Sequence, residues 1–378
     1  QPATAAWVRS RTMNLSDVRL RTNRQPQRTP RRARRSMVVL IAAALLMTAT
    51  AYDMAVAGRR CTGSGFGRDA THILQCKNRK WTRIMTFGQY AELMARVQAE
   101  QERATSSAAR AEVTRGTSAW VDVYDWSPTW VNFKSTGATA PFTLDRIDRM
   151  AESGITALWI QTAKVDFGSD VLDRDLLVRI INRARSKGMK VFGWYLPTFE
   201  NPAVDQNLLA KTAELGLDGI GVDIESTVVD LATRNARLVS LSQWLRAAYP
   251  SMPLGAIVLP PVVTEVLNLN YWPQFPWTEL APFYDVWMPM GYWTNRSATS
   301  EWRDAFRYTT ENIDRIRTNL NNPNAPIHAI GGLSNTSSID DVNRFVFGAK
   351  LRGAYGGGLY DDMISTADQY RALAPFRG

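Results

Sequence analysis

The segment Leu215-Gly-Leu-Asp-Gly-Ile-Gly-Val-Asp-Ile-Glu225 combines a short apolar strand pattern with two carboxylates at its end. In an extended strand, side chains alternate between the two faces, so Asp223 and Glu225 share one face and the apolar residues share the other. A strand buried in a parallel sheet is expected to be apolar on both faces. Two acids at its carboxyl end therefore indicate a functional site, because α/β barrels carry their active sites there. The alternative is a pair of solvated acids at a strand end.

Seven further apolar runs alternate with helical patterns, as expected of repeated β-α units around a parallel sheet. The eight expected strands are residues 119–124, 155–161, 190–196, 219–224, 253–259, 285–292, 326–330 and 352–360. The clearest expected helices are residues 143–153, 173–187, 207–215, 228–248, 299–320 and 338–350. Eight units over about 260 residues predict an α/β protein with a (β/α)8 TIM barrel at residues 118–378. A doubly wound open sheet is the alternative, but no Gly-x-Gly-x-x-Gly follows the first run, so we expect no dinucleotide and no other cofactor.

The first 36 residues carry nearly all of the net charge. They contain ten Arg and one acid, Asp17, and so account for nine of the ten net positive charges of the chain. A protein that binds nucleic acid would spread its basic residues over a folded face. We therefore expect no nucleic-acid partner, and we interpret residues 1–36 as a disordered targeting region.

An uninterrupted apolar run at residues 37–51 follows the arginines directly. Its length is short for a membrane span of about 20 residues, and Ala55-Val56-Ala57 offers a small-x-small cleavage site. Residues 37–57 are thus predicted to be either a cleaved signal peptide or a transmembrane anchor in the cytoplasmic membrane. In both cases the arginines stay in the cytoplasm, which predicts an extracytoplasmic barrel, secreted or membrane-anchored.

Cys61 and Cys76, the only two cysteines, lie in the next segment, residues 58–86. An exported pair at this spacing predicts a disulfide in a small module. Metal binding is the alternative, but with only His72 nearby the segment is one ligand short of a structural zinc site. Residues 87–117 have helical character and are interpreted as a stalk, or as an amphipathic helix packed on the barrel.

Acidic and aromatic residues gather at the expected carboxyl ends of the strands, and aromatic rings beside carboxylates suit sugars. The residues that we expect to contact substrate are Asp125, Trp126, Gln161, Trp194, Tyr195, Trp287, Met290, Trp293, Tyr360 and Asp361. The alternative is that the tryptophans only fill the core. The whole chain has two His, and both Cys are expected to be paired. The sequence therefore has too few residues of the right types for a catalytic triad, a reactive thiol or a metal site, and no metal is predicted.

Residues Asp218 to Glu225 resemble the fourth-strand signature D-G-x-D-x-D-x-E of family 18 glycoside hydrolases, the chitinase-like barrels. The last Asp and the proton-donating Glu of that signature fall on Asp223 and Glu225, whereas its middle Asp falls on Gly221. Met290-Gly-Tyr292 is similar to the M-x-Y segment of the sixth strand in the same family, where an Asp follows but this chain has Trp293. The barrel also looks like uncharacterised actinobacterial glycosidase-like barrels.

The resemblance implies a glycoside hydrolase that acts on a polysaccharide, with catalytic residues Glu225, Asp223 and Tyr292. Glu225 would be the general acid, Asp223 would orient an acetamido group, Tyr292 would bond it, and the carbonyl of the substrate would be the nucleophile. If that mechanism does not apply, a second acid must act, and Asp125 and Asp361 are the candidates. The rival hypothesis is an inactive carbohydrate-binding barrel on the cell surface, and a third is a structural scaffold in the cell envelope.

Overall fold

The computed structural model describes residues 54–62 and 65–377, which divide between residues 100 and 101 into two compact units. This division falls within helix α2 (Phe87–Glu112). The predicted Arg-rich region and most of the predicted membrane segment, residues 1–53, lie outside the described residues. Within the described ranges, no helix combines the length and apolar character that a membrane span requires.

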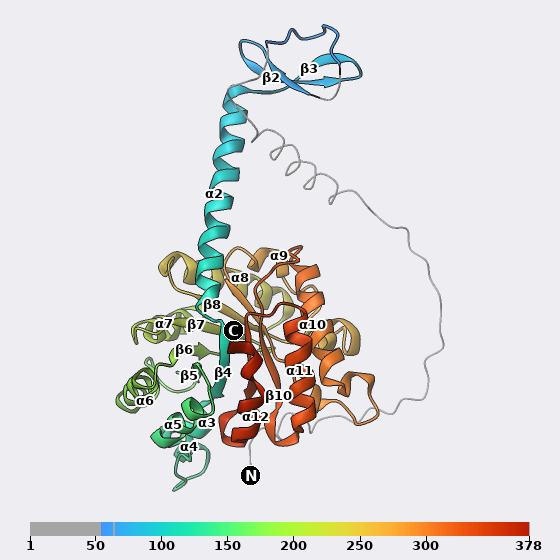
Figure 1. Cartoon of the computed structure of the whole chain (residues 1–378). Helices are drawn as coiled ribbons and strands as arrows, with labels where there is room; N and C mark the ends of the chain where they lie inside the picture. Colours follow the sequence, from blue (N-terminus) through green and yellow to red (C-terminus); the bar gives the residue numbers. More distant parts are fainter. Residues whose placement is uncertain (1–53, 63–64, 378) are drawn as a thin grey trace, which may run out of the picture. The chain divides into compact units, whose positions relative to one another are not determined.

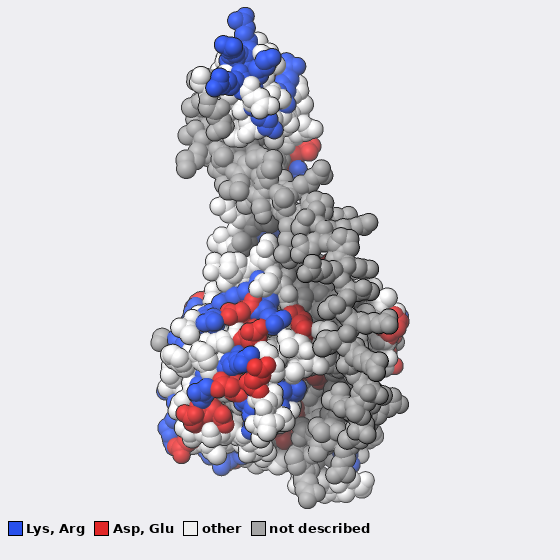
Figure 2. Space-filling view, turned by 90° about the vertical axis from the view of Figure 1, so that its right-hand side faces the viewer, with Lys and Arg blue, Asp and Glu red and all other residues white. Residues whose placement is uncertain are grey.

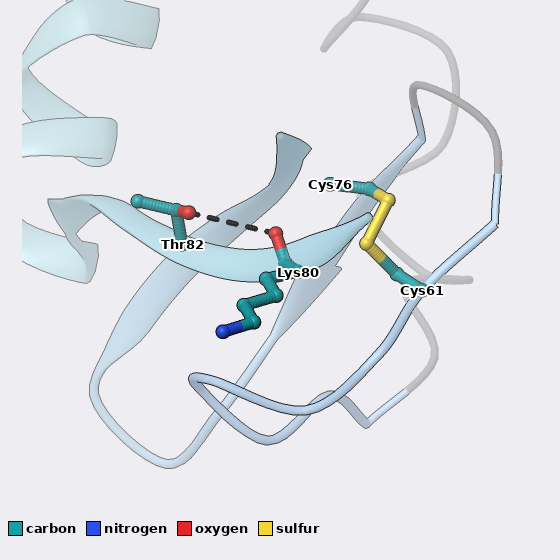
Figure 3. The surroundings of a disulfide bond; sticks show 4 residues. All are labelled: Cys61, Cys76, Lys80 and Thr82. Carbon is teal, nitrogen blue, oxygen red and sulfur yellow. Dashed lines mark hydrogen bonds between the residues drawn. A yellow bond between two sulfur atoms is a disulfide. The ribbon is translucent and has the colours of Figure 1, made fainter. Parts of the chain in front are cut away.

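The first unit contains a three-stranded antiparallel sheet of β1 (Phe66–Arg68), β2 (His72–Lys77) and β3 (Lys80–Thr86). The predicted disulfide is confirmed: Cys61 is bonded to Cys76 on β2 (Figure 3). The module begins earlier than the expected residue 58, because Met54 bridges Arg68 and the amide of Ala55 donates to the Arg68 carbonyl at 2.8 Å.

The surface of this module is strongly basic (Figure 2). Its exposed basic residues are Arg59, Arg60, Arg68, Lys77, Arg79, Lys80 and Arg83. They stand against one acid, Asp69, which pairs with Arg83 at 2.6 Å. The positive charge of the chain is therefore not confined to its first 36 residues, although the rest of the chain compensates for it.

The second unit contains the predicted barrel, an eight-stranded parallel sheet (Figure 1). Its strands are β4 (Gly116–Val121), β5 (Ala157–Gln161), β6 (Lys190–Tyr195), β7 (Gly219–Ile224), β8 (Leu254–Val258), β9 (Val286–Pro289), β10 (His328–Leu333) and β11 (Gly356–Tyr360). β11 pairs with β4, so the first and last strands are neighbours. Bridges from Trp287 to Ile327 and from Met290 to Ile330 bring β9 next to β10, which nearly closes the sheet. The predicted TIM barrel is confirmed.

Helices surround the barrel (Figure 1). The long ones are α5 (Leu144–Glu152), α6 (Arg174–Ser186), α7 (Pro202–Ala213), α8 (Leu231–Ala248), α10 (Ala305–Asn319) and α11 (Ile339–Leu351). Shorter helices that the sequence patterns did not predict are α3 (Val123–Trp126), α4 (Pro128–Lys134), α9 (Trp277–Leu280) and α12 (Ala367–Ala372). One core fills the space between strands and helices, and a second, smaller core fills the barrel interior.

The chain between residues 107 and 114 packs at the amino-terminal end of the barrel. Ser107 and Arg110 of α2 both contact the buried carboxylate of Asp285, which directly precedes β9. The Lys190 ammonium donates to the carbonyl of Val113 at 2.6 Å, and Val113 packs against the interior core. At least this part of residues 87–117 is therefore packed on the barrel and is not a free stalk. The opposite end of the barrel, at the carboxyl ends of its strands, is where active sites of this fold lie.

Candidate active site at the carboxyl end of the barrel

Asp223 and Glu225 lie at the carboxyl end of β7. Asp223 is the penultimate residue of the strand and is buried, and Glu225 follows the strand and is half-buried. Gly221, two positions earlier on the same face, borders Trp159 and Trp194 of the interior core, so this face of β7 points into the barrel.

Burial raises the pKa of both carboxyl groups, because a charged carboxylate loses its hydration there. The neighbouring charge of Glu225 raises the pKa of Asp223 further. Oδ1 of Asp223 is buried and accepts no hydrogen bond from any described residue. The pair thus combines carboxyl groups that favour their protonated forms with a buried oxygen that has no partner among the described residues.

Tyr292 connects this pair to the last strand. Burial raises the pKa of Tyr292, and so do the charges of Glu225, Asp223, Asp361 and Asp122. The Tyr292 ring centroid lies 5.7 Å from that of Tyr360 at the end of β11.

The Tyr360 hydroxyl donates to Oδ2 of Asp122 at 2.6 Å, and Asp122 directly follows β4. The carboxyl ends of β4, β7 and β11 and the segment that follows β9 therefore supply polar groups to one site.

Asp122, Asp125 and Asp361 form an acidic cluster at this site. One oxygen of each carboxylate lies within 4.8 Å of the other two. Burial, together with the charges of Asp122 and Asp361, raises the pKa of Asp125 to about 9. Burial and the charge of Asp122 raise the pKa of Asp361 to about 7. Among the described residues, this is the group of acids that has the geometry to hold a metal ion.

Lys164 is a site residue that the sequence reasoning missed. It lies three positions after the end of β5, and its ammonium is 5.0 Å from the Trp130 ring centroid and 5.9 Å from that of Tyr124. Burial lowers the pKa of Lys164, whereas the charges of Asp223, Asp166 and Asp122 raise it. Lys164 in turn lowers the pKa of Asp223 and of Glu225. Its only signal in the sequence is its position shortly after an expected strand.

An aromatic cluster borders the site beside Lys164. Trp130 of α4 contacts Tyr124, Phe133 and Phe167, with ring centroids 5.1 to 5.6 Å apart. The Tyr124 side chain is 38% exposed and that of Phe133 is 60% exposed, whereas Trp130 is buried. Exposed aromatic faces at the rim of a barrel mouth are suited to contact the apolar face of a sugar ring.

Four aromatic residues that we expected at the substrate lie elsewhere. Trp126, Tyr195, Trp287 and Trp293 are buried in the core between the strands and the helices, with exposed fractions of 3% or less. Tyr195 and Trp287 lie on the outer face of their strands, and the Tyr195 hydroxyl donates to Asp205 at 2.7 Å. Because no surface of these rings reaches the barrel mouth, we do not include them in the proposed site.

The remaining predicted residues lie at or beneath the site. Trp194 and Met290 belong to the interior core, under the acids of β7. Gln161 is buried, and its side-chain oxygen accepts from the amide of Val123 at 3.2 Å while its carbonyl accepts from the Trp126 indole at 2.9 Å. Gln161 therefore positions the segment that carries Asp122 and Asp125, and its side-chain oxygen is not free for substrate.

The interior core explains why a glycine stands at position 221. A Cβ atom there would lie 2.8 Å from Cδ1 of Ile257 and 3.1 Å from the Trp159 ring. Trp159 itself stacks between Trp120 and Phe192, with centroid distances of 5.1 and 4.3 Å. The floor of the barrel mouth is therefore apolar and closely packed where the chitinase-like signature has its middle Asp.

No protein-family model matches the chain, and no curated protein matches its sequence. Its fold is similar to that of solved chitinase structures, among them one of family 18. A family 18 chitinase from Cycas revoluta in complex with (GlcNAc)4 superposes with a TM-score of 0.53 at 11% identity, covering 69% of this chain and 99% of that one. The C-terminal domain of a putative chitinase from Desulfitobacterium hafniense superposes with a TM-score of 0.52 at 11% identity, covering 69% and 98%. The Bacillus cereus spore cortex-lytic enzyme SleL has a TM-score of 0.52 at 10% identity, covering 70% and 74%.

Proposed function

We propose that this protein is an extracytoplasmic glycoside hydrolase in which Glu225 is the general acid. The observation that carries the proposal is the pair of inward-facing carboxyl groups at the end of β7, whose pKa values burial raises. A general acid must be protonated when the glycosidic bond breaks, and a raised pKa keeps a carboxyl group protonated closer to neutral pH.

The arrangement suits a substrate-assisted reaction on an N-acetylhexosamine unit. Glu225 donates its proton to the glycosidic oxygen, and the leaving sugar departs with that proton. The acetamido carbonyl of the substrate forms the new bond to the anomeric carbon, Asp223 orients the acetamido group and Tyr292 donates a hydrogen bond to it. Water then replaces the carbonyl. Oδ1 of Asp223 has no hydrogen-bond partner among the described residues and can accept from an acetamido N–H, which supports a role for Asp223 in orienting the acetamido group.

The proposed substrate class is supported by what the solved structures of similar fold bind or degrade. The Cycas chitinase was solved with (GlcNAc)3 and with (GlcNAc)4, and SleL is a spore cortex-lytic enzyme. We therefore propose a polysaccharide that contains N-acetylhexosamine, either chitin or the glycan of peptidoglycan. The rim aromatics Tyr124 and Phe133 would contact the neighbouring sugar unit.

Release of reducing ends from chitin and from peptidoglycan glycan tests the activity. The wild type is expected to release them from at least one polymer, and Glu225→Gln, which keeps the shape of the side chain but cannot donate a carboxylic proton, is expected to lose 10²-fold or more of that rate, on the order expected for a general acid. Glu279→Gln, at an exposed acid of α9, is the matched control and should keep full activity. Full activity of Glu225→Gln would contradict the proposal.

A second candidate function, an inactive carbohydrate-binding barrel, is favoured by one observation. The apolar floor at Gly221 lacks the middle acid of the chitinase-like signature, and Trp159 and Ile257 leave no room for it. A protein that lost turnover would keep the fold and the aromatic rim but not the full set of acids. Retention of the wild type on an insoluble polymer, without any release of reducing ends, would support this function and exclude the hydrolase.

The extracytoplasmic location rests on the amino-terminal pattern of ten Arg followed by an apolar run, and is supported by the disulfide. The cytoplasmic membrane would be the partner of the amino-terminal segment. Protease added to intact cells should digest the barrel, and a thiol reagent should leave Cys61 and Cys76 unlabelled. A protected barrel with two reactive thiols would show that the location is wrong.

A further inference from the structure

The acidic cluster of Asp122, Asp125 and Asp361 is not needed for the proposed proton transfer, yet it gathers three carboxyl groups in a small volume. One oxygen of each lies within 4.8 Å of the others. Asp122 and Asp125 follow the first strand of the barrel and Asp361 follows the last, and these two strands pair directly in the sheet. Like charges this close repel strongly, so the cluster needs protons or a cation to be stable.

The basic groups near the cluster do not balance it. Arg146 lowers the pKa of Asp125 through its charge, but its guanidinium donates to the carboxylate and the carbonyl of Asp362. The charge of Lys164 acts on Asp122, and it is shared with Asp223 and Asp166.

Two oxygens of the cluster have no partner within the part of the chain that the structure describes. Asp361 is 8% exposed, and its Oδ1 is buried and accepts no hydrogen bond from the residues that the structure describes. Oδ2 of Asp125 is in the same state. Asp122 differs, because its two oxygens accept from the amide of Tyr124 and from the hydroxyl of Tyr360. A buried carboxylate oxygen without a partner is costly, which indicates that a ligand completes the site.

We propose that Asp122, Asp125 and Asp361 bind a calcium ion. Calcium is a hard cation that takes six to eight oxygen ligands, carboxylates and waters among them, in a flexible geometry, whereas magnesium demands near-ideal octahedral geometry. Three carboxylates from two segments of the chain, each with an oxygen within 4.8 Å of the others, suit the ion that tolerates irregular geometry. The ligands that the three carboxylates do not supply are water molecules.

The ion has a structural consequence and a mechanistic one. It fastens the segment after β4 to the segment after β11, and these are the first and the last strand of the barrel in the sequence. It also occupies Asp125 and Asp361, the two candidates for a second catalytic acid. If the proposed function holds as well, this leaves the substrate carbonyl, oriented by Asp223, as the nucleophile.

Terbium luminescence on the full-length protein, freed of metal by a chelator, tests the site. Tb³⁺ replaces Ca²⁺ on oxygen ligands, and Trp126, one residue after Asp125, can sensitise its emission. The wild type is expected to give emission that Ca²⁺ displaces and that Mg²⁺ displaces at least tenfold less effectively. Isothermal calorimetry should give one Ca²⁺ per chain, and Ca²⁺ should raise the unfolding temperature.

Asp361→Asn should weaken Ca²⁺ binding at least tenfold, and Asp125→Asn should do the same. The control is Asp368→Asn, at an exposed acid of α12, which should bind Ca²⁺ like the wild type. The circular dichroism spectrum of each metal-free variant separates lost binding from lost folding, and if one site variant fails to fold, the other decides.

Absence of calcium heat and of displaceable emission in the wild type would overturn the proposal, and would mean that the carboxyl groups share protons. Equal binding by both folded site variants would overturn it too. Because binding is measured without any polysaccharide, this result is independent of whether the protein hydrolyses one.

Discussion

Gly221 marks the main departure of this site from the chitinase-like signature, and the packing around it makes a prediction. In Gly221→Ala the new Cβ would lie 2.8 Å from Cδ1 of Ile257 and 3.1 Å from the Trp159 ring. Overpacking of this kind costs about 1–3 kcal/mol of unfolding free energy. Ile257→Val removes the clashing Cδ1 and costs about 0.5–1.5 kcal/mol by itself. The double variant should therefore lose less unfolding free energy than the two single variants lose together, as measured by urea denaturation. If the two losses simply add in the double variant, a clash with Ile257 is not what keeps position 221 a glycine.

Lys164 controls the charge state of the acids beside it. Its positive charge lowers the pKa of Glu225, so Lys164→Met should raise that pKa. A general acid is active in its protonated form, and activity falls as the pH rises through its pKa. The alkaline limb of kcat/KM should thus move to higher pH in Lys164→Met, whatever the change in absolute rate. An alkaline limb that stays in place or moves to lower pH would show that Lys164 does not act on Glu225.

At the residue scale, strand alternation indicated Asp223 and Glu225, whereas Tyr292 was predicted from the resemblance of its segment to the M-x-Y segment, and the catalytic roles of all three stay predictions. It placed Tyr195 and Trp287 at the substrate although strand alternation puts them on the outer face, opposite their neighbours Trp194 and Met288. Trp126 was misplaced for another reason. The strand ends at Val121, and Asp122 caps a helix whose first residue is Val123, so Trp126 turns into the core.

Among the elements, α2 is attached to the barrel by a buried ionic group. Asp285 is 2% exposed and pairs with Arg110 of α2 at 2.9 Å and with Arg246 of α8 at 2.6 Å. Asp285→Ala leaves two guanidinium groups without their partner, and breaking a buried pair in this way costs about 3 kcal/mol or more. Asp314→Ala, at an exposed pair with Arg352, should cost less than about 1 kcal/mol in the same chemical denaturation experiment. Equal losses for the two variants would show that the Asp285 group does not support the fold.

Two of the longer elements were predicted almost to the residue, because apolar residues recur along them. The expected strand 219–224 coincides with β7, and the expected helix 338–350 differs from α11 by one residue at each end. α3 and α4 were not predicted, since helices of four and seven residues have too few turns to show a period. Asp122, the cap of α3, falls inside the expected strand 119–124 and was not among the expected substrate contacts.

For the whole molecule, the two compact units should respond differently to a reductant. The Cys61–Cys76 bond closes a loop with a sequence separation of 15, and a loop of this size contributes about 3 kcal/mol to stability. Reduction should therefore speed the hydrogen exchange of the amides in β2 and β3 without changing that of β4 to β11. Cys61→Ser/Cys76→Ser should reproduce the effect without reductant. Faster exchange in the barrel strands, or no change in β2 and β3, would contradict the division of the chain into two independently stabilised units.

The eightfold alternation of strand and helix made the barrel predictable, although the solved structures reported above share only 10–11% identity with the chain. Periodicity survives changes that erase sequence identity, because it depends only on which side of each element is buried. The acidic cluster could not be predicted in the same way. It joins Asp122 and Asp361 across almost the whole barrel sequence, and only the pairing of β11 with β4 brings them together.

The most direct test of the account compares Glu225→Gln with the wild type on two substrates: a β-linked N-acetylhexosamine oligomer and an aryl glycoside of the same sugar. A sugar leaving group needs a proton, whereas a nitrophenolate leaves without one. If Glu225 is the general acid, the variant should lose about 10²–10⁴-fold in the rate on the oligomer and far less on the aryl glycoside. Equal losses on both substrates, or no loss on the oligomer, would contradict the central claim.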